Sequence, residues 1–292
     1  MKRLTKEHST VLYDAGDSAA MTVGCGEVFQ LETASVLTYG EGVPSSGFAV
    51  PVTGPIWIDD AKPGSVLKTE IIKLELASGR GAVLSMPGRG AFGNQLLAPA
   101  LKVVTYDNRY AYFNESIRVP LRPMVGKVAV APAGKAINCH ATGSYGGNMD
   151  ITDLTEGCSI YLPVFVEGAL LSCGDVHAVM GDGESSYSAV ETEGLLTLRC
   201  QVLHDIELTH PMVVTPNEVM TVGHGGTLEE ACTMALDNMV TLVMKELDLD
   251  YVETTMLISV ACDLRINQIC NVPAVGARVV LPKALLPEGG TL

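Results

Sequence analysis

Long hydrophobic runs are missing from this sequence, although 47% of its 292 residues are hydrophobic. A membrane-spanning helix needs roughly 18 to 20 consecutive apolar residues. The opening "MKRLTKEHST" also lacks the apolar stretch of a secretory signal. We therefore expect a folded, cytoplasmic protein without a membrane partner.

Basic residues are scarce as well. The chain has 19 Lys and Arg against 33 Asp and Glu, a formal net charge of −14. Binding to a phosphate backbone needs a positive surface, so nucleic acid is excluded as an expected partner. A pocket lined by carboxylates would suit a metal cation better than an anion.

Several catalytic signatures are absent too. The eight cysteines are spread singly, without a C-x-x-C pair, and no G-x-S-x-G nucleophile elbow occurs. "GRGAFG" at 88–93 spells a dinucleotide-binding fingerprint, but Pro99 stands where its helix would have to run. We therefore expect reduced thiols and no nucleotide cofactor.

What is abundant is turn residues, with 30 glycines and 15 prolines. They divide roughly the first 210 residues into short apolar segments, which favours strands over helices. "LLTLRCQVLHDIEL" (195–208) alternates apolar and polar residues most clearly. Further strands are predicted in "FAVPVTGPIWI" (48–58), "SVLKTEIIKLEL" (65–76) and "MVGKVAVAP" (124–132).

One segment has helical spacing. In "GTLEEACTMALDNMVTLVMKEL" (226–247), Thr227 and Glu230 form a capping-box pattern ahead of an amphipathic repeat. The fold class expected is mainly β, a sandwich-like or barrel-like body with a smaller α+β portion toward the C-terminus. We expect soft boundaries between an N-terminal β-rich part (1–130), a central β part (131–210) and a C-terminal α+β part (211–292).

Acidic residues gather in two glycine-rich segments, "GSYGGNMDITDL" (143–154) and "GDVHAVMGDGE" (174–184). Asp, His and Glu are ligands for a divalent cation such as Zn²⁺, and Asp175 and His177 would share one face of a strand. A cation could neutralise carboxylates that otherwise repel each other. Alternatively, Asp150, Asp175 and Asp182 could simply cap turns.

The same residues carry a family resemblance. "GGNMDITDLTEGCSIYLPVFVEGALLSCGDVHAVMGDGE" resembles the central block of the acetamidase/formamidase family, and "VTGPIWIDDAKPGSVLKTEI", "MVGKVAVAPA" and "SVACDLRINQI" resemble its flanking blocks. The resemblance implies a homo-oligomeric hydrolase that converts short aliphatic amides into a carboxylate and ammonia. It also implies a divalent metal, with zinc as the first choice; calcium is the cation expected if the acidic loops instead form a structural site.

The motif positions matched by this chain are Asn148, Asp150, Asp175, His177, Asp182 and Glu184. On chemical grounds we expect Asp150, Asp175 and His177 to hold the metal and Glu184 to carry protons between water and the leaving amine. We expect Asp182 to orient His177 or Glu184, and Asn148 to donate a hydrogen bond to the oxyanion. Met180 and Tyr145 are expected to wall the substrate pocket.

Three departures from the family pattern bear on activity. Tyr145 replaces a histidine of the motif, for which His140 could substitute, and Ser35 and Val50 replace an acid and an asparagine. These changes leave two further hypotheses open. One is a hydrolase of a related C–N bond such as a small lactam, and the other is a catalytically silent β scaffold that binds a structural cation.

Overall fold

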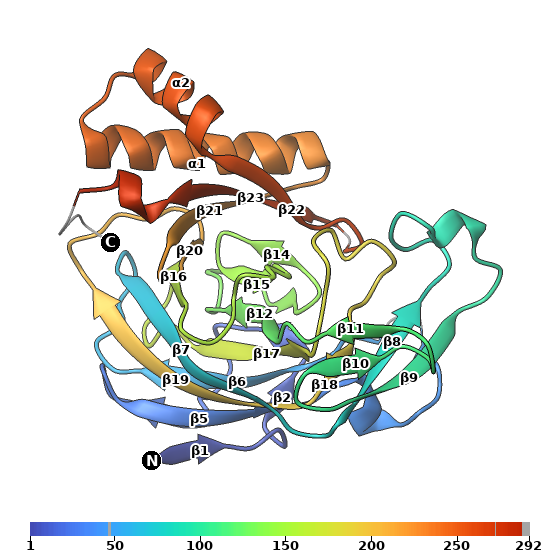
Figure 1. Ribbon diagram of the computed structural model, residues 1–292. Coiled ribbons are helices and arrows are strands. Elements are labelled where there is room, and N and C mark those ends of the chain that lie inside the picture. The colour runs from blue at the N-terminus through green and yellow to red at the C-terminus, as the bar shows by residue number, and fades with distance from the viewer. Residues whose placement is uncertain (46–47, 272, 288–292) are drawn as a thin grey trace.

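Two large β-sheets form most of the molecule, and two helices cover one side of it (Figure 1). The computed structural model describes residues 1–45, 48–271 and 273–287. Strands dominate, and both α-helices lie near the C-terminus. The predicted fold class, mainly β with a small C-terminal α+β portion, is confirmed.

The first sheet has nine strands in the described chain. In pairing order they are β1 (Lys2–Leu4), β5 (Val28–Thr33), β19 (Gly194–Leu203), β7 (Val66–Leu76), β16 (Ser159–Pro163), β20 (Met212–Val214), β21 (Glu218–Gly225), β23 (Val275–Pro282) and β22 (Asp263–Gln268). Strands from the beginning, middle and end of the chain are therefore interleaved in one sheet.

The second sheet has twelve strands in the described chain. Its main path is β11 (Arg118–Pro120), β10 (Tyr110–Tyr112), β9 (Ala100–Tyr106), β8 (Arg80–Ser85), β18 (Glu191–Thr192), β17 (Leu171–His177), β12 (Met124–Ala129), β15 (Gly146–Asn148) and β14 (Thr142–Gly143). β6 (Val52–Ile58) pairs with β17 and also with β2 (Ser9–Thr10) and β4 (Met21–Val23). A separate pair joins β3 (Leu12–Tyr13) to β13 (Ile137–Asn138).

The predicted strands are present, with one difference in length. β6, β7 and β12 lie within the segments identified from the sequence, and β19 pairs with β7 along its whole length. β19 ends at Leu203, although the alternating pattern continues to Leu208. His204 and Asp205 are exposed at this point, so the chain turns away before the apolar pattern ends.

The main hydrophobic core lies between the two sheets. Phe29, Leu31 and Ile71 of the first sheet belong to the same buried cluster as Val128 and Val176 of the second. Each such side chain contributes about 1.5–3 kcal/mol relative to an exposed position. This core fixes β12 and β17 rigidly, and these two strands carry much of the site described below.

The helical layer covers β21 and β23 (Figure 1). α1 (Leu228–Leu247) begins at the predicted cap: Thr227 Oγ1 accepts from the Glu230 N–H, and the Glu230 carboxylate accepts from the Thr227 N–H, both at 3.2 Å. The face of α1 that packs on the sheet buries its residues Ala235, Met239 and Val243. α2 (Tyr251–Ala261) packs against α1, and its far side is exposed.

Three short 3₁₀ helices complete the described elements, η1 (Val36–Tyr39), η2 (Gly93–Gln95) and η3 (Lys283–Leu285). All eight cysteines are free thiols, five of them buried. Among the described residues, neither α-helix combines the length and the hydropathy that a bilayer crossing requires.

Candidate active site

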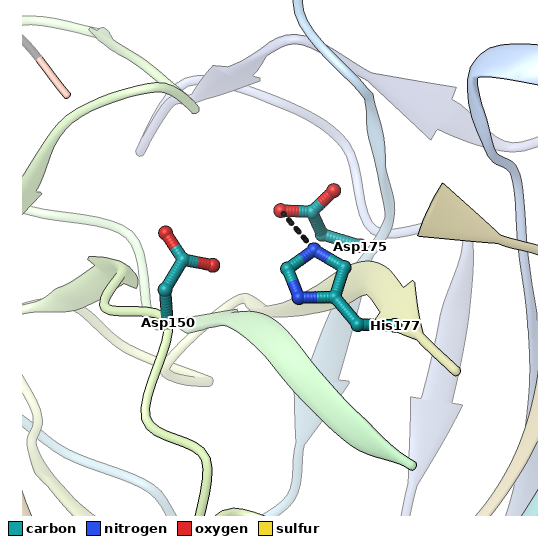
Figure 2. Close-up of side chains that lie close together, drawn as sticks. All are labelled: Asp150, Asp175 and His177. Atoms are coloured by element: carbon teal, nitrogen blue, oxygen red, sulfur yellow. Dashed lines mark ion pairs between the residues drawn. The ribbon is translucent and has the colours of Figure 1, made fainter. Parts of the chain in front are cut away.

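The central strand of the site is β17, which carries both Asp175 and His177. It lies between β12 and β18 in the second sheet, so that His177 is paired with Met124 on one side and with Glu191 on the other. Figure 2 shows Asp175 and His177 side by side, with Asp150 pointing toward them from the segment after β15. The two glycine-rich segments singled out in the sequence therefore meet in space.

Three acidic residues of the site have left-handed backbone conformations, with φ of 50° at Asp150, 62° at Asp175 and 41° at Glu184. Such a conformation costs roughly 1–2 kcal/mol for a residue with a Cβ. Glutamate tolerates it less readily than aspartate, whose short side chain can hydrogen-bond locally. The fold holds these three carboxylates in place against that cost, and strain of this kind concentrates at functional sites.

Close approach of two of the carboxylates depends on Gly126 in β12. A Cβ at this position would lie 2.5 Å from Asp150 Oδ1 and 2.9 Å from Asp175 Oδ2. Both distances are well inside the ~3.5 Å of ordinary contact. Any other residue here would displace at least one carboxylate, so the glycine makes room for the site.

Charged groups converge around His177. Its Nε2 lies 3.2 Å from Glu191 Oε2 and 3.7 Å from Asp175 Oδ2, the latter drawn as a dashed line in Figure 2. The ammonium of Lys127 lies 3.3 Å from Asp175 Oδ2. All four side chains are buried, so these interactions are little weakened by solvent.

Amide and thiol groups support the carboxylates from behind. Asn271 Nδ2 donates to Asp150 Oδ2 at 3.0 Å, and Cys270 Sγ donates to Glu184 Oε2 at 3.1 Å. With its amide nitrogen toward the carboxylates, Asn148 donates to Asp150 Oδ2 and Asp175 Oδ2, each at 3.2 Å. The connection between β22 and β23 therefore contributes one wall of the site.

The donor set fits a divalent metal ion. Asp150, Asp175 and His177 each offer a ligand atom within 4.8 Å of the others, and so do His177, Glu184 and Glu191. Asp150 Oδ1, Glu191 Oε2 and both ring nitrogens of His177 are buried without a hydrogen-bond partner. Buried polar atoms are nearly always paired. His177 Nε2 and Glu191 Oε2 face each other at 3.2 Å, so it is the other two atoms, Asp150 Oδ1 and His177 Nδ1, that indicate a site built to receive a ligand.

Burial and mutual repulsion separate the acidities of these carboxyl groups. Burial, followed by the charge of Asp175, raises the pKa of Asp150 to about 7. Burial and the neighbouring charge of Asp150 raise the pKa of Glu184 well above its usual range. Burial acts on Asp175 in the same direction, but Lys127 and His177 outweigh it and hold the pKa of Asp175 below its usual range. Asp175 is therefore the resident anion, and Glu184 can hold a proton at neutral pH.

Asp182 stands apart from this cluster. Its carboxylate accepts from Arg278 Nη2 at 2.9 Å and from Thr152 Oγ1 at 2.7 Å. Arg278 is fully buried and also binds Asp153, with 2.8 Å between Nε and Oδ2. Instead of the expected contact with His177 or Glu184, Asp182 anchors the segment that precedes Glu184.

A small cavity opens onto the cluster, with a volume of about 40 Å³. One water needs roughly 10–15 Å³ measured this way, so about three non-hydrogen atoms fit. Its polar wall comprises Lys127, His140, Asn148, Asp175, Glu184, Ser188, Glu191 and Asn271. Its other wall comprises Val36, Pro44, Phe48, Val50, Leu84 and Tyr187.

The three residues that depart from the family pattern, together with Met180 and His140, differ in how close they lie to the cavity. Tyr145 packs against Tyr13 in the main core, with ring centroids 5.7 Å apart, and Met180 packs with Met124. Neither belongs to the described lining of this cavity, and Met180 instead lines a neighbouring hollow together with Glu184. Val50 and His140 do line it, and His140 Nε2 lies 2.8 Å from the Phe48 carbonyl oxygen. Ser35 is buried ahead of η1, next to the lining residue Val36.

Sequence reasoning missed Lys127, Glu191, Cys270 and Asn271. Only Lys127 carried a signal, as a lysine inside the apolar segment "MVGKVAVAP". Glu191 reaches the site because β18 pairs with β17, and Cys270 and Asn271 reach it through the fold of the C-terminal segment. Neither relationship is visible as a local pattern.

Fold and site together define a class of protein: a predominantly β molecule in which a buried cluster of carboxylates and one imidazole adjoins a cavity of a few atoms. The family model of the acetamidase/formamidase family matches residues 118–287. The chain belongs to this family.

Solved structures agree over the whole chain. A predicted acetamidase/formamidase from Thermoanaerobacter tengcongensis is 35% identical to this chain, with a TM-score of 0.93. The match covers 97% of this chain and 96% of that protein. An acetamidase from Bacillus halodurans is 32% identical with a TM-score of 0.90 and covers 97% of each chain. Among curated proteins, the acetamidase of Mycolicibacterium smegmatis is 40% identical over 72 residues, which span 24% of this chain and 18% of that protein.

Proposed function

We propose that this protein hydrolyses short linear amides such as formamide and acetamide to a carboxylate and ammonia. The observation that carries the proposal is one buried cluster of Asp150, Asp175, His177, Glu184 and Glu191, in a chain of this family. Three of these residues, Asp175, Glu184 and Glu191, line a cavity of about 40 Å³. Formamide has three non-hydrogen atoms and acetamide four, which matches the room available.

A divalent cation, with zinc as the first choice, belongs in this proposal. Asp150, Asp175 and His177 would hold it, and Glu191, which forms a second ligand group with His177 and Glu184, is a further candidate ligand. When bound, such an ion lowers the pKa of a water molecule and polarises a carbonyl group. The imidazole nitrogen and the small number of oxygen donors favour zinc over calcium, which prefers six to eight oxygen ligands.

Proton transfer in the proposed reaction belongs to Glu184. The oxygen of a water molecule adds to the carbonyl carbon while its proton passes to the Glu184 carboxylate. The same proton then moves to the amide nitrogen as the C–N bond breaks, leaving a carboxylic acid and ammonia. The acid gives its proton to ammonia, so that the products at neutral pH are a carboxylate and ammonium. A raised pKa suits a group that must hold this proton between the two steps. Asn148 lies on the cavity wall, but both of its amide N–H groups donate to Asp150 and Asp175. Its part in the proposal is therefore to position these two carboxylates, in place of the oxyanion contact expected from the sequence.

Replacement of Glu184 tests the proton transfer. Glu184→Gln should lower kcat by about 10²-fold or more, since general acid-base catalysis contributes at least that much, while bound metal is retained. Glu7→Gln, at an exposed position, is the control. A Glu184→Gln rate within threefold of the parent would show that another group moves the proton.

Replacement of His177 tests the metal. His177→Ala should lower the zinc content measured by elemental analysis, whereas His204→Ala, at an exposed histidine, should leave it unchanged. Full zinc stoichiometry in His177→Ala would remove this residue from the ligand set. A protein that binds calcium but no zinc, and releases no ammonia, would favour the silent scaffold.

Substrate range is tested by ammonia release from formamide, acetamide and propionamide, and by ring opening of small lactams. The cavity volume predicts that rates fall from acetamide to propionamide. Hydrolysis of lactams without hydrolysis of linear amides would favour the alternative hypothesis, a hydrolase of small lactams.

Assembly into homo-oligomers and location in the cytoplasm also remain predictions. The exposed side of α2 carries Tyr251, Val252, Met256 and Val260, an apolar surface of the kind that subunits bury. Light scattering coupled to gel filtration measures the mass of the assembly directly.

A further inference from the structure

A buried lysine stands inside the acidic cluster. Lys127 is the fourth residue of β12, every other member of which is apolar or glycine, and its side chain is 2% exposed. Burying an ammonium group costs free energy unless it is paired and hydrogen-bonded. An apolar residue would continue the strand without this cost, so the lysine has to be explained by what it contacts.

The contacts of Lys127 leave part of its ammonium group available. Nζ donates to the Val50 carbonyl oxygen at 2.9 Å and lies 3.3 Å from Asp175 Oδ2. An ammonium group has three N–H donors, so the described contacts account for two of them. Lys127 also lines the cavity, and Asn148, its partner across the β12–β15 ladder, lines it too.

Charge is distributed unequally around the cavity. The other acidic side chains in its described lining are the carboxyl groups of Asp175, Glu184 and Glu191, of which Asp175 is the resident anion. His140 is half-buried and uncharged at neutral pH, because burial lowers its pKa. Lys127 therefore marks the electropositive end of an otherwise acidic cavity.

A primary amide has the complementary polarity, with an acceptor oxygen at one end and two N–H donors at the other. We infer that Lys127 orients the substrate: its ammonium binds the carbonyl oxygen, and the NH₂ group lies toward Glu184 and Glu191. This inference rests on the proposed function and adds a substrate-binding catalytic residue to it. Negative charge grows on the carbonyl oxygen as water adds, and Lys127 stabilises it while keeping its own proton.

The orientation has two chemical consequences. The product carboxylate should bind at Lys127, so acetate and formate should act as competitive inhibitors. The nitrogen end faces carboxylates that accept hydrogen bonds, so primary amides should be preferred. N-methylacetamide, which has one N–H fewer and one methyl group more, should react at least tenfold more slowly than acetamide.

The test compares Lys127→Gln and Lys127→Arg with the parent, and Lys73→Met, at an exposed salt bridge on β7, is the control. Losing one oxyanion donor typically costs 10²–10³-fold in kcat. Lys127→Gln should lose about that much, with unchanged zinc content and a tenfold weaker inhibition by acetate. Lys127→Arg should retain more activity than Lys127→Gln because it keeps the charge. Equal inhibition by acetate and a rate within threefold of the parent in a folded Lys127→Gln would overturn the inference.

Thermal shift measurements separate this inference from the proposed function. In protein treated with a chelator, acetate should raise the melting temperature of the parent and of Lys73→Met, and not that of Lys127→Gln. If the parent hydrolyses no amide, the proposed function fails, but the acetate shift still shows whether Lys127 forms an anion site. If Lys127→Gln does not fold, Lys127→Arg decides: loss of acetate protection despite a retained charge would refute the assigned contact.

Discussion

The replacement Gly126→Ala tests how closely the carboxylates of the site must approach one another. The added methyl group would lie 2.5 Å from Asp150 Oδ1 and 2.9 Å from Asp175 Oδ2. Ordinary contact requires about 3.5 Å, so Asp150 must move by about 1 Å. Both carboxylates are buried between β12, β17 and the β22–β23 connection, and there is little free space into which they could relax.

The expected loss follows from that displacement. A misplacement of 1 Å in a catalytic arrangement can cost about 10²-fold in rate. Overpacking a buried position typically costs about 1–3 kcal/mol in unfolding free energy. We therefore expect Gly126→Ala to fold with reduced stability, to lose at least about 10²-fold in kcat/KM for acetamide, and to bind zinc more weakly.

The assay combines ammonia release, zinc analysis and urea denaturation. Gly42→Ala is the control, because a Cβ at Gly42 would meet nothing within 4 Å and its backbone is not left-handed. If Gly126→Ala retained the rate and the zinc affinity of the parent, the two carboxylates would not need their present separation. The reasoning that places the reaction at this cluster would then be wrong.

Three further predictions concern stability. Asp150 has a pKa of about 7 against a reference value of 3.8, so this group favours folding at low pH and opposes it as pH rises through about 7; in a chelating buffer, Asp150→Asn should be more stable than the parent at pH 8 by up to about 4 kcal/mol and nearly equal to it at pH 4 in urea denaturation. A parent whose relative stability does not fall over that range would contradict the assignment. Arg278→Met should lose about 2–3 kcal/mol, since it leaves the Asp182 carboxylate without its cation and Asp153 with only the longer 3.7 Å ion pair to Arg265; an unchanged urea midpoint would show that this ion pair does not anchor the Glu184 segment. Thr227→Ala should lose about 1 kcal/mol in thermal unfolding with activity unchanged, and a lowered kcat would mean that α1 influences the site.

Local patterns in the sequence were sufficient to predict part of the fold. The capping box at Thr227 and Glu230 predicted the start of α1 because it is a contact between residues three apart. α2 was not predicted, because its apolar residues include Val252, Met256 and Val260 on the exposed side, which obscures the helical pattern. The two-sheet architecture depends on pairings such as β5 with β19, between residues more than 150 positions apart.

The site, like the fold, was predictable only where its contacts are local in the sequence. Asp175 and His177 are two apart on one strand, so their proximity followed from strand geometry. Glu184 and Asp182 are also two apart, but they separate because Arg278 binds Asp182 while Cys270 contacts Glu184. No local pattern contains that competition for partners, which arises only when the C-terminal strands pack against the central loops.

Completion of the site by the β22–β23 connection has a consequence for synthesis of the protein. A nascent chain that has emerged only to residue 262 already contains Asp150, Asp175, His177 and Glu184. It lacks Asn271 and Cys270, which contact Asp150 and Glu184, and Arg278, which binds Asp182 ahead of Glu184. The three carboxyl groups and the imidazole would then lie in an open pocket, without the hydrogen bonds that the C-terminal segment donates to Asp150 and Glu184. Catalytic competence should therefore appear only after the last two strands have joined the first sheet, so that activity reports completed folding.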